Sequence, residues 1–269
     1  AEIIKDGHRF FEDGEKMQLS YAVRNTHRTI GTRASSHIVR KFGMRNALQP
    51  DHLTVKLTGS CGQSLGAFAA PGLKLEVSGD ANDYVGKGLS GGIIVVRPSM
   101  ESPLDASENT IIGNTVLYGA TDGYLFAAGQ AGERFAVRNS GAKVVIEGCG
   151  THGCEYITGG VAVILGSIGA NFGAGMTGGM AYVHDPHGTA LDYMNLESLV
   201  TGPVAHPHWE AQLRGLVERH AAETGSRKAA AILANWDVER GRFLQVCPRE
   251  MLAHLSHPLA AEDNMLLAE

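Results

Sequence analysis

The sequence predicts a mainly β fold: a single-stranded, right-handed parallel β-helix with an N-terminal segment leading into it and C-terminal helices beside it. Two observations favour this fold class. Of the 35 glycines in the 269-residue chain, 27 fall between Leu57 and Asn195. The same stretch repeats a short apolar run at intervals of 18 or 19 residues. Because the gaps between the runs lack helical periodicity, we expect the runs to stack as parallel strands and not to alternate with helices.

Each repeat is marked by the residue that precedes its apolar run. The markers are Gly92, Gly123, Ala142, Gly160 and Gly179. The last four are separated by 19, 18 and 19 residues, and the 31-residue interval after the first contains an excursion over residues 99–109. A further copy, APGLKLEVSGD, precedes them. Internal repeats of this length indicate a solenoid built from stacked units.

Side chains within the repeats alternate as they do in a strand. The positions two and four residues after each marker are aliphatic in all five copies: Ile94, Val96, Leu125, Ala127, Val144, Ile146, Ala162, Ile164, Ala181 and Val183. The interleaved positions also accept Tyr124, Lys143 and Tyr182. Because strand side chains have a period of two, we predict that the aliphatic set lines the interior and the interleaved set points outward.

Glycine pairs at the start of the runs predict corners of the solenoid. We assign structural corners to Gly91, Gly92, Gly123, Gly141, Gly159, Gly160, Gly178 and Gly179. Glycine reaches positive φ values and lets two backbones approach closely. GKGLSGG and GAGMTGG contain the GxGxxG spacing of dinucleotide-binding loops, but they run into IIVV and MAYV where such a loop needs a helix. We therefore predict no catalytic, cofactor-binding or metal-binding residue among them.

Three zones follow from glycine content and periodicity. They are an N-terminal segment (1–56), a glycine-rich β-helix (57–195) and a C-terminal helical extension packed on the β-helix (196–269). In the first zone, apolar spacing predicts one short helix from Ser35 to Phe42.

The C-terminal zone carries helix start and stop signals. Pro207 and Gly225 bound one helix, and Ser226 caps a second helix that we expect over residues 227–239. RFLQV predicts a short strand, and Pro248 opens a last helix.

Charge and composition exclude several classes of protein. No apolar run reaches the 18 residues of a membrane span. Residues 57–195 carry six Lys or Arg against twelve Asp or Glu, whereas a nucleic-acid surface needs clustered positive charge. We therefore expect no membrane and no nucleic-acid partner, and a cytoplasmic location. Four cysteines in a chain of this size do not predict a disulfide framework, and a start at Ala1 without Met predicts a piece of a longer protein.

Two groups of residues carry ligand chemistry and leave alternatives open. Cys149, His152 and Cys154 in CGTHGC offer three soft metal ligands, although structural zinc sites usually have four. The competing interpretation, which we favour, is that the thiols are buried as small hydrophobic groups. A second group comprises Asp185 and the histidines His184, His187, His206 and His208. It could form a weak metal-binding loop, but we favour a solvated connector.

Four stretches of the sequence carry a family likeness. They are RNTHRTIGTRASSHIVRKFG, DYVGKGLSGGIIVV, GCGTHGCEYITGGVAVILGSIGANFGAGMTGGMAYVHD and ETGSRKAAAILANWDVERGRFLQVCPRE. Together they resemble the C-terminal GXGXG domain of the glutamate synthase large-subunit family. The resemblance follows the chain in order over nearly its whole length.

The resemblance implies a parent enzyme that converts glutamine, 2-oxoglutarate and a reductant into two glutamates and channels ammonia internally. It implies FMN and a 3Fe–4S cluster in the parent. Where a small subunit is present, it implies FAD, 4Fe–4S clusters and NADPH in addition. In other members it implies ferredoxin as the electron donor. It implies that this domain binds no cofactor and holds the glutaminase and FMN-synthase domains in relation to each other. The resemblance also implies the small NADPH-oxidising subunit as a partner in some members. Whether the free fragment associates with a second copy through the exposed ends of the solenoid stays open at this point.

We therefore expect a non-catalytic scaffold, and we carry over no catalytic residue from the family. The alternative is a β-helix module of another redox complex, with a metal site at Cys149, His152 and Cys154. Whether the parent uses NADPH or ferredoxin stays open at this point.

Overall fold

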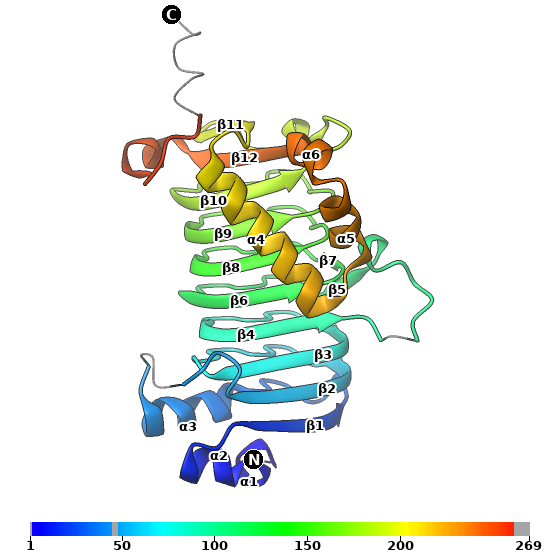
Figure 1. The fold of residues 1–269 in the computed structure, drawn as a ribbon, viewed down its shortest axis with the longest axis vertical. Coiled ribbons are helices and arrows are strands. Elements are labelled where there is room, and N and C mark those ends of the chain that lie inside the picture. The colour runs from blue at the N-terminus through cyan, green and yellow to red at the C-terminus, as the bar shows by residue number, and fades with distance from the viewer. Residues whose placement is uncertain (1, 45–47, 100, 261–269) are drawn as a thin grey trace, which may run out of the picture.

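The computed structural model describes residues 2–44, 48–99 and 101–260, and these residues form a mainly β fold (Figure 1). The strands are β1 (Met17–Val23), β2 (Leu53–Cys61), β3 (Leu73–Ala81), β4 (Ser90–Arg97), β5 (Thr110–Ile112), β6 (Asp122–Ala127), β7 (Gln130–Ala131), β8 (Ser140–Ile146), β9 (Thr158–Ile164), β10 (Gly178–His184), β11 (Leu199–Pro203) and β12 (Phe243–Pro248). The α-helices are α1 (Glu2–Asp6), α2 (His8–Asp13), α3 (Thr32–Phe42), α4 (Pro207–Thr224), α5 (Arg227–Ala234) and α6 (Trp236–Glu239). Four short 3₁₀ turns are η1 (Ala106–Glu108), η2 (Ala190–Tyr193), η3 (Arg240–Arg242) and η4 (Arg249–His254).

The strands form one mixed sheet. Its main path runs β1, β2, β3, β4, β6, β8, β9, β10, β12, β11, while β5 and β7 branch from β3. All neighbours from β1 to β10 pair in parallel, and β12 pairs antiparallel with both β10 and β11. The prediction of mainly β structure is therefore confirmed, but the last two strands depart from the predicted parallel arrangement. They come from the C-terminal segment, which lies outside the glycine repeat.

The repeats stack in the register that their spacing predicts. Leu125 lies opposite Ile94 on one side and Val144 on the other, and Ala162 lies between Val144 and Ala181. Equivalent positions of successive repeats therefore lie side by side across the sheet, so the interior carries continuous rows of aliphatic side chains.

The two faces of these strands belong to two separate hydrophobic clusters. All ten aliphatic positions of the repeat lie in the first cluster, inside the fold. The interleaved positions face the opposite side, as predicted, yet Phe126, Val145 and Tyr182 are fully buried there. Helix α4 crosses β4, β6, β8 and β9 (Figure 1). Its apolar side chains, such as Leu213, belong to the same cluster and cover this face, and Gln212 of α4 accepts a hydrogen bond from the hydroxyl of Tyr182.

A corner with alternating backbone conformation links the stacked units. In each of six successive units, three residues at alternate positions have positive φ: Ser64, Gly66 and Phe68; Tyr84, Gly86 and Gly88; Thr115, Leu117 and Gly119; Arg134, Ala136 and Arg138; His152, Cys154 and Tyr156; Asn171, Gly173 and Gly175. The N–H of Tyr84 donates to the next unit at Asn114 (2.9 Å), and the N–H of Gly86 donates to the previous unit at Leu65 (2.8 Å). Each unit is thereby hydrogen-bonded to both of its neighbours.

The segments flanking the repeats match the helix signals in most respects. Helix α3 contains the predicted stretch from Ser35 to Phe42, and α4 begins at Pro207 and ends before Gly225, which has a φ of 69°. The single helix expected over residues 227–239 is divided into α5 and α6, because Asn235 leaves the helical conformation. Within the described residues, none of the helices has the length and apolar character needed to cross a membrane.

Candidate functional site

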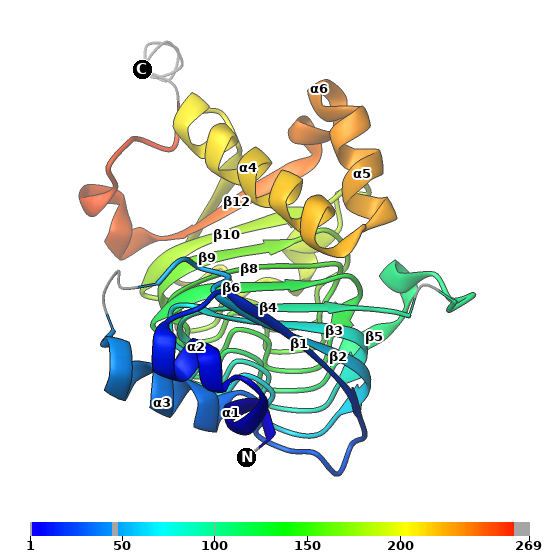
Figure 2. The ribbon, with the colours of Figure 1, turned by 60° about the horizontal axis from the view of Figure 1, so that its bottom comes forward.

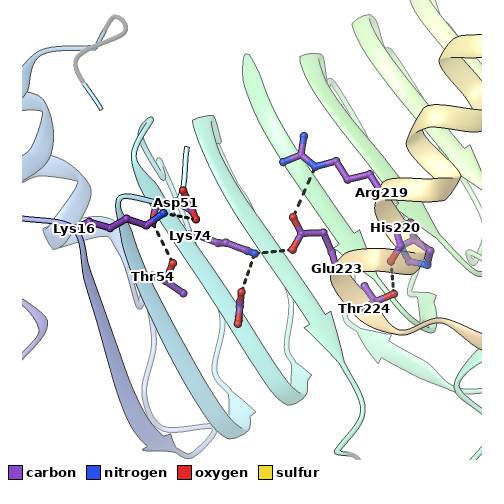
Figure 3. Close-up of polar contacts among 9 residues, drawn as sticks. Lys16, Asp51, Thr54, Lys74, Arg219, His220, Glu223 and Thr224 are labelled. Atoms are coloured by element: carbon purple, nitrogen blue, oxygen red, sulfur yellow. Dashed lines mark hydrogen bonds and ion pairs between the residues drawn. The ribbon is translucent and has the colours of Figure 1, made fainter. Parts of the chain in front are cut away.

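The C-terminal half of α4 is fastened to the outer face of the sheet by a partly buried ion pair (Figure 3). Lys74 Nζ on β3 lies 2.6 Å from Glu223 Oε2 on α4 and 2.8 Å from Glu76 Oε1. Burial of Lys74 disfavours its charge, but the two carboxylates outweigh burial and raise the pKa of Lys74 above its ordinary value. The pair therefore stays charged and ties the helix to a strand 149 residues away in sequence.

A second, fully buried contact ties α4 and α5 to the end of β8. Ser226 Oγ donates a short hydrogen bond to Glu147 Oε1 and accepts one from the N–H of Ala229 (3.0 Å), which makes Ser226 the N-cap of α5. His220 Nε2 of α4 lies 3.5 Å from the same carboxylate oxygen. Glu147 thus joins two helices to the sheet, and we call the Lys74 and Glu147 contacts together the α4 clamp.

A polar cleft of about 440 Å³ lies where β8, β9 and β10 end. Its lining includes His184, Asp185, Glu147 and Lys228. His184 Nε2 is 2.7 Å from Glu239 Oε2, and burial lowers the pKa of His184 although this carboxylate opposes the shift. Both carboxylate oxygens of Asp185 accept backbone N–H groups of the following turn. The acidic groups of this cleft therefore hold the local backbone and the helices in place.

The histidines that the sequence groups together lie in two places. His184 and His187 line the polar cleft, whereas His206 and His208 lie at the start of α4. There the rings of His208 and His257 stack with centroids 3.9 Å apart. The structure thus gives the four histidines different surroundings. The favoured interpretation of a solvated connector is wrong for His184, which is buried.

Cys149 and Cys154 lie in the hydrophobic core, whereas the side chain of His152 lies near the surface beside a carboxylate. Both thiols are buried, and burial raises the pKa of Cys149 to about 12. The His152 side chain is 45% exposed, and its Nδ1 lies 2.8 Å from Glu155 Oε1. Across residues 2–44, 48–99 and 101–260, no group of three or more His, Cys, Asp or Glu side chains is arranged to hold a metal ion. The geometry thus favours buried thiols over the metal site.

The eight glycines assigned to corners fall into two kinds. Four have positive φ, and they are Gly91, Gly123, Gly160 and Gly179, at 119°, 106°, 85° and 74°. At three of the others a Cβ would meet a carbonyl oxygen of the preceding unit, and they are Gly141, Gly159 and Gly178. At Gly92 a Cβ would lie 2.9 Å from the Cβ of Ala69. Their role as structural corners stays a prediction that substitution tests.

The alternating positive-φ corner was missed by the sequence analysis. Most of its positions hold residues other than glycine, such as Arg134, Ala136 and Arg138 in the fourth unit. Its signal was the GxG spacing ahead of a glycine pair, which occurs at Gly173 and Gly175 and at Gly86 and Gly88. In the structure these glycines are followed by strand β10, so the GxGxxG spacing there precedes a strand and not a helix.

Comparison with known proteins decides the family. Residues 1–249 match the sequence profile of the family described as "GXGXG motif". The chain belongs to this family. The match spans the N-terminal helices, the stacked strands, α4 and the antiparallel strand β12, so the GXGXG family unit includes the segments on both sides of the glycine repeat.

Relatives of this GXGXG chain are large glutamate synthase chains. It is 63% identical over 96% of its length to the "Glutamate synthase [NADPH] large chain" of Azospirillum brasilense. It is 46% identical over 97% of its length to the "Glutamate synthase [NADH]" of Schizosaccharomyces pombe, and 50% identical over 85% to the "Ferredoxin-dependent glutamate synthase" of Pyropia yezoensis. The chain spans only 17%, 12% and 15% of these three relatives.

Proposed function

We propose that this chain is the non-catalytic scaffold domain of a glutamate synthase and that it winds as a right-handed parallel β-helix. The proposed winding rests on parallel pairing of β6, β8, β9 and β10 at intervals of 18 or 19 residues. Parallel connections in one sheet are almost always right-handed. In the proposed parent, glutamine, 2-oxoglutarate and a reductant give two glutamates, and ammonia passes internally between the two catalytic domains.

The observation that carries the proposal is the continuous lateral bonding of the stack. Parallel pairing runs without interruption along the path from β1 to β10, and α4 spans four of these strands as a strut. The α4 clamp fixes this strut at Lys74 and Glu147. Such a column keeps two bound partners at a fixed distance. Transfer of a reactive intermediate between two sites requires such a fixed distance.

The range of relatives supports a role that is independent of the electron donor. Relatives named for NADPH, NADH and ferredoxin all align with at least 85% of this chain. A domain shared by enzymes with different reductants is suited to a task common to all of them. Holding the glutaminase and FMN-synthase domains in relation to each other is such a task. We propose the small NADPH-oxidising subunit as a further partner in some enzymes, and the cytoplasm as the location.

Purification of the chain by itself tests the non-catalytic part of this proposal. We expect β-rich circular dichroism, no flavin absorbance and no stoichiometric metal. We also expect neither glutamine hydrolysis nor glutamate formation when substrates and reductant are supplied. Turnover that co-purifies with the chain and disappears in a variant of the polar cleft, such as Lys228→Met, would overturn the proposal.

A further inference from the structure

The N-terminal end of the stack has an open strand edge. Strand β1 is the terminal strand of the sheet and, among the described residues, pairs only with β2. The N–H of Met17 donates to His52 (2.9 Å), so β1 residues at alternate positions after Met17 also face β2. Gln18, Ser20 and Ala22 therefore direct their backbone N–H and C=O groups away from β2. These three residues are exposed, and such an edge is a template for a further strand.

A cavity of about 400 Å³ with mixed polar and apolar walls opens beside this edge. Its walls come from α1, β1, β2, the start of α3 and the loop before it. Their apolar part is formed by Ile3, Ile4, Val23, Ile30 and Leu57. Figure 2 brings this end of the molecule forward and shows α1, α2 and α3 grouped beside β1. A volume of this size accepts large apolar side chains of a bound segment.

Arginines without an ion-pair partner among the described residues lie in the cavity wall and close to it in the chain. Arg24, Arg28 and Arg33 are exposed, and no described residue forms an ion pair with any of their guanidinium groups. Arg28 and Arg33 line the cavity directly. Among the described residues, Glu2 is the only acidic residue that lines it. Residues 1–56 carry ten Lys or Arg against six Asp or Glu, in a chain whose net charge is −5. The charge at this end therefore complements an acidic partner.

We propose that this end of the stack docks an extended acidic segment from a neighbouring domain of the parent enzyme. The segment adds to the free edge of β1 as a further strand, places an apolar side chain in the cavity and sets carboxylates against Arg28 and Arg33. Main-chain hydrogen bonds supply affinity, while the cavity and the arginines select the sequence. This inference rests on the proposed scaffold function and names the surface through which one partner is held.

Hydrogen exchange with single-residue resolution, measured on the full-length parent, tests the docking. We expect the amides of Gln18, Ser20 and Ala22 to exchange at least tenfold more slowly in the wild-type parent than in the Arg28→Glu, Arg33→Glu double variant. The amides of Leu19 and Tyr21, which face β2, should stay equally protected in both and thereby report that the strand remains folded. Arg249→Glu, which removes an exposed arginine after β12, should leave all five amides unchanged.

Two results would overturn the inference: rapid exchange at Gln18, Ser20 and Ala22 in the wild-type parent, or equal exchange in the wild-type and the double variant. Glutamate formed per glutamine hydrolysed, measured on the same samples, separates this inference from the scaffold proposal. If these amides exchange rapidly in an enzyme that still forms one glutamate from each ammonia released, the docking proposal is wrong. The scaffold proposal is then unaffected.

Discussion

Individual residues in this chain are constrained chiefly by the backbone of the neighbouring unit. Gly160 has a φ of 85°, and a Cβ there would meet the carbonyl oxygen of Ala142 and approach Asn139 Nδ2 to 2.8 Å. Asn139 is itself fully buried and hydrogen-bonds to Ala142 through both its amide nitrogen and its oxygen. A side chain at Gly160 therefore adds backbone strain and displaces a buried polar contact at once.

We predict that Gly160→Val destabilises the fold by about 3 kcal/mol or more, which lowers Tm by roughly 5 to 10 °C. Gly202→Val is the matched control, because Gly202 lies in β11 without positive φ and nothing lies within 4 Å of its added Cβ. Thermal unfolding followed by circular dichroism compares the two variants. Equal melting of Gly160→Val and wild type would remove Gly160 from the set of corners.

Burial of His184 makes a prediction about pH. Burial lowers the pKa of His184 in the folded chain, so the unfolded chain binds the proton more readily, near pH 6.5. The stabilising effect of neutral His184 is complete above that pH and is lost as the pH falls toward the folded pKa. Between about pH 7.5 and about pH 5.5 the free energy of unfolding should thus fall more in wild type than in His184→Gln. Parallel pH profiles in urea titrations would contradict this prediction.

At the scale of elements, α4 matters because it holds several strands at once. Its outward face offers a natural comparison, since Arg214 and Glu218 form an ion pair whose side chains are 51% and 53% exposed. In the α4 clamp, Lys74 and Glu223 are 14% and 19% exposed. Solvent-exposed salt bridges contribute little to stability. Removal of one partner of a partly buried pair is more costly, because it leaves the other charge buried without an opposite charge.

A double-mutant cycle on Lys74→Met and Glu223→Gln should give a coupling energy of about 1 to 3 kcal/mol. The same cycle on Arg214→Met and Glu218→Gln should give about 0.5 kcal/mol or less. Urea unfolding measures both cycles. If the two coupling energies agree, α4 is not clamped to β3 by this pair.

The sequence predicts the repeated strands well, because their alternation and spacing are both regular. It also locates α4 through Pro207 and Gly225. It fails for β1, α1 and α2, since these elements fall outside the repeat and β1 gains its stability from pairing with β2. It predicts that the C-terminal helices pack on the repeat, but it does not identify Phe126 as a residue that α4 buries. The candidate docking surface was likewise invisible, because its edge and cavity exist only in three dimensions.

As a whole molecule, the chain is a column with distinguishable ends. Helices α1 to α3 lie at the end that carries β1, and β11 and β12 lie at the other end (Figure 1). Because each strand adds about 4.8 Å to the column, the number of stacked units sets the distance between its ends. The proposed scaffold function requires that this distance matters to the parent enzyme.

Lengthening the column by one unit tests that requirement most directly. Residues 53–72 form one unit, since Leu53 pairs with Leu73, and their duplication leaves β3 and every strand that α4 crosses unaltered. We predict that the full-length parent carrying the duplication still hydrolyses glutamine and still forms glutamate from added ammonia. Glutamate formed per glutamine hydrolysed should fall at least tenfold, with ammonia released into solution. Unchanged coupling in a folded, lengthened enzyme would contradict the scaffold function.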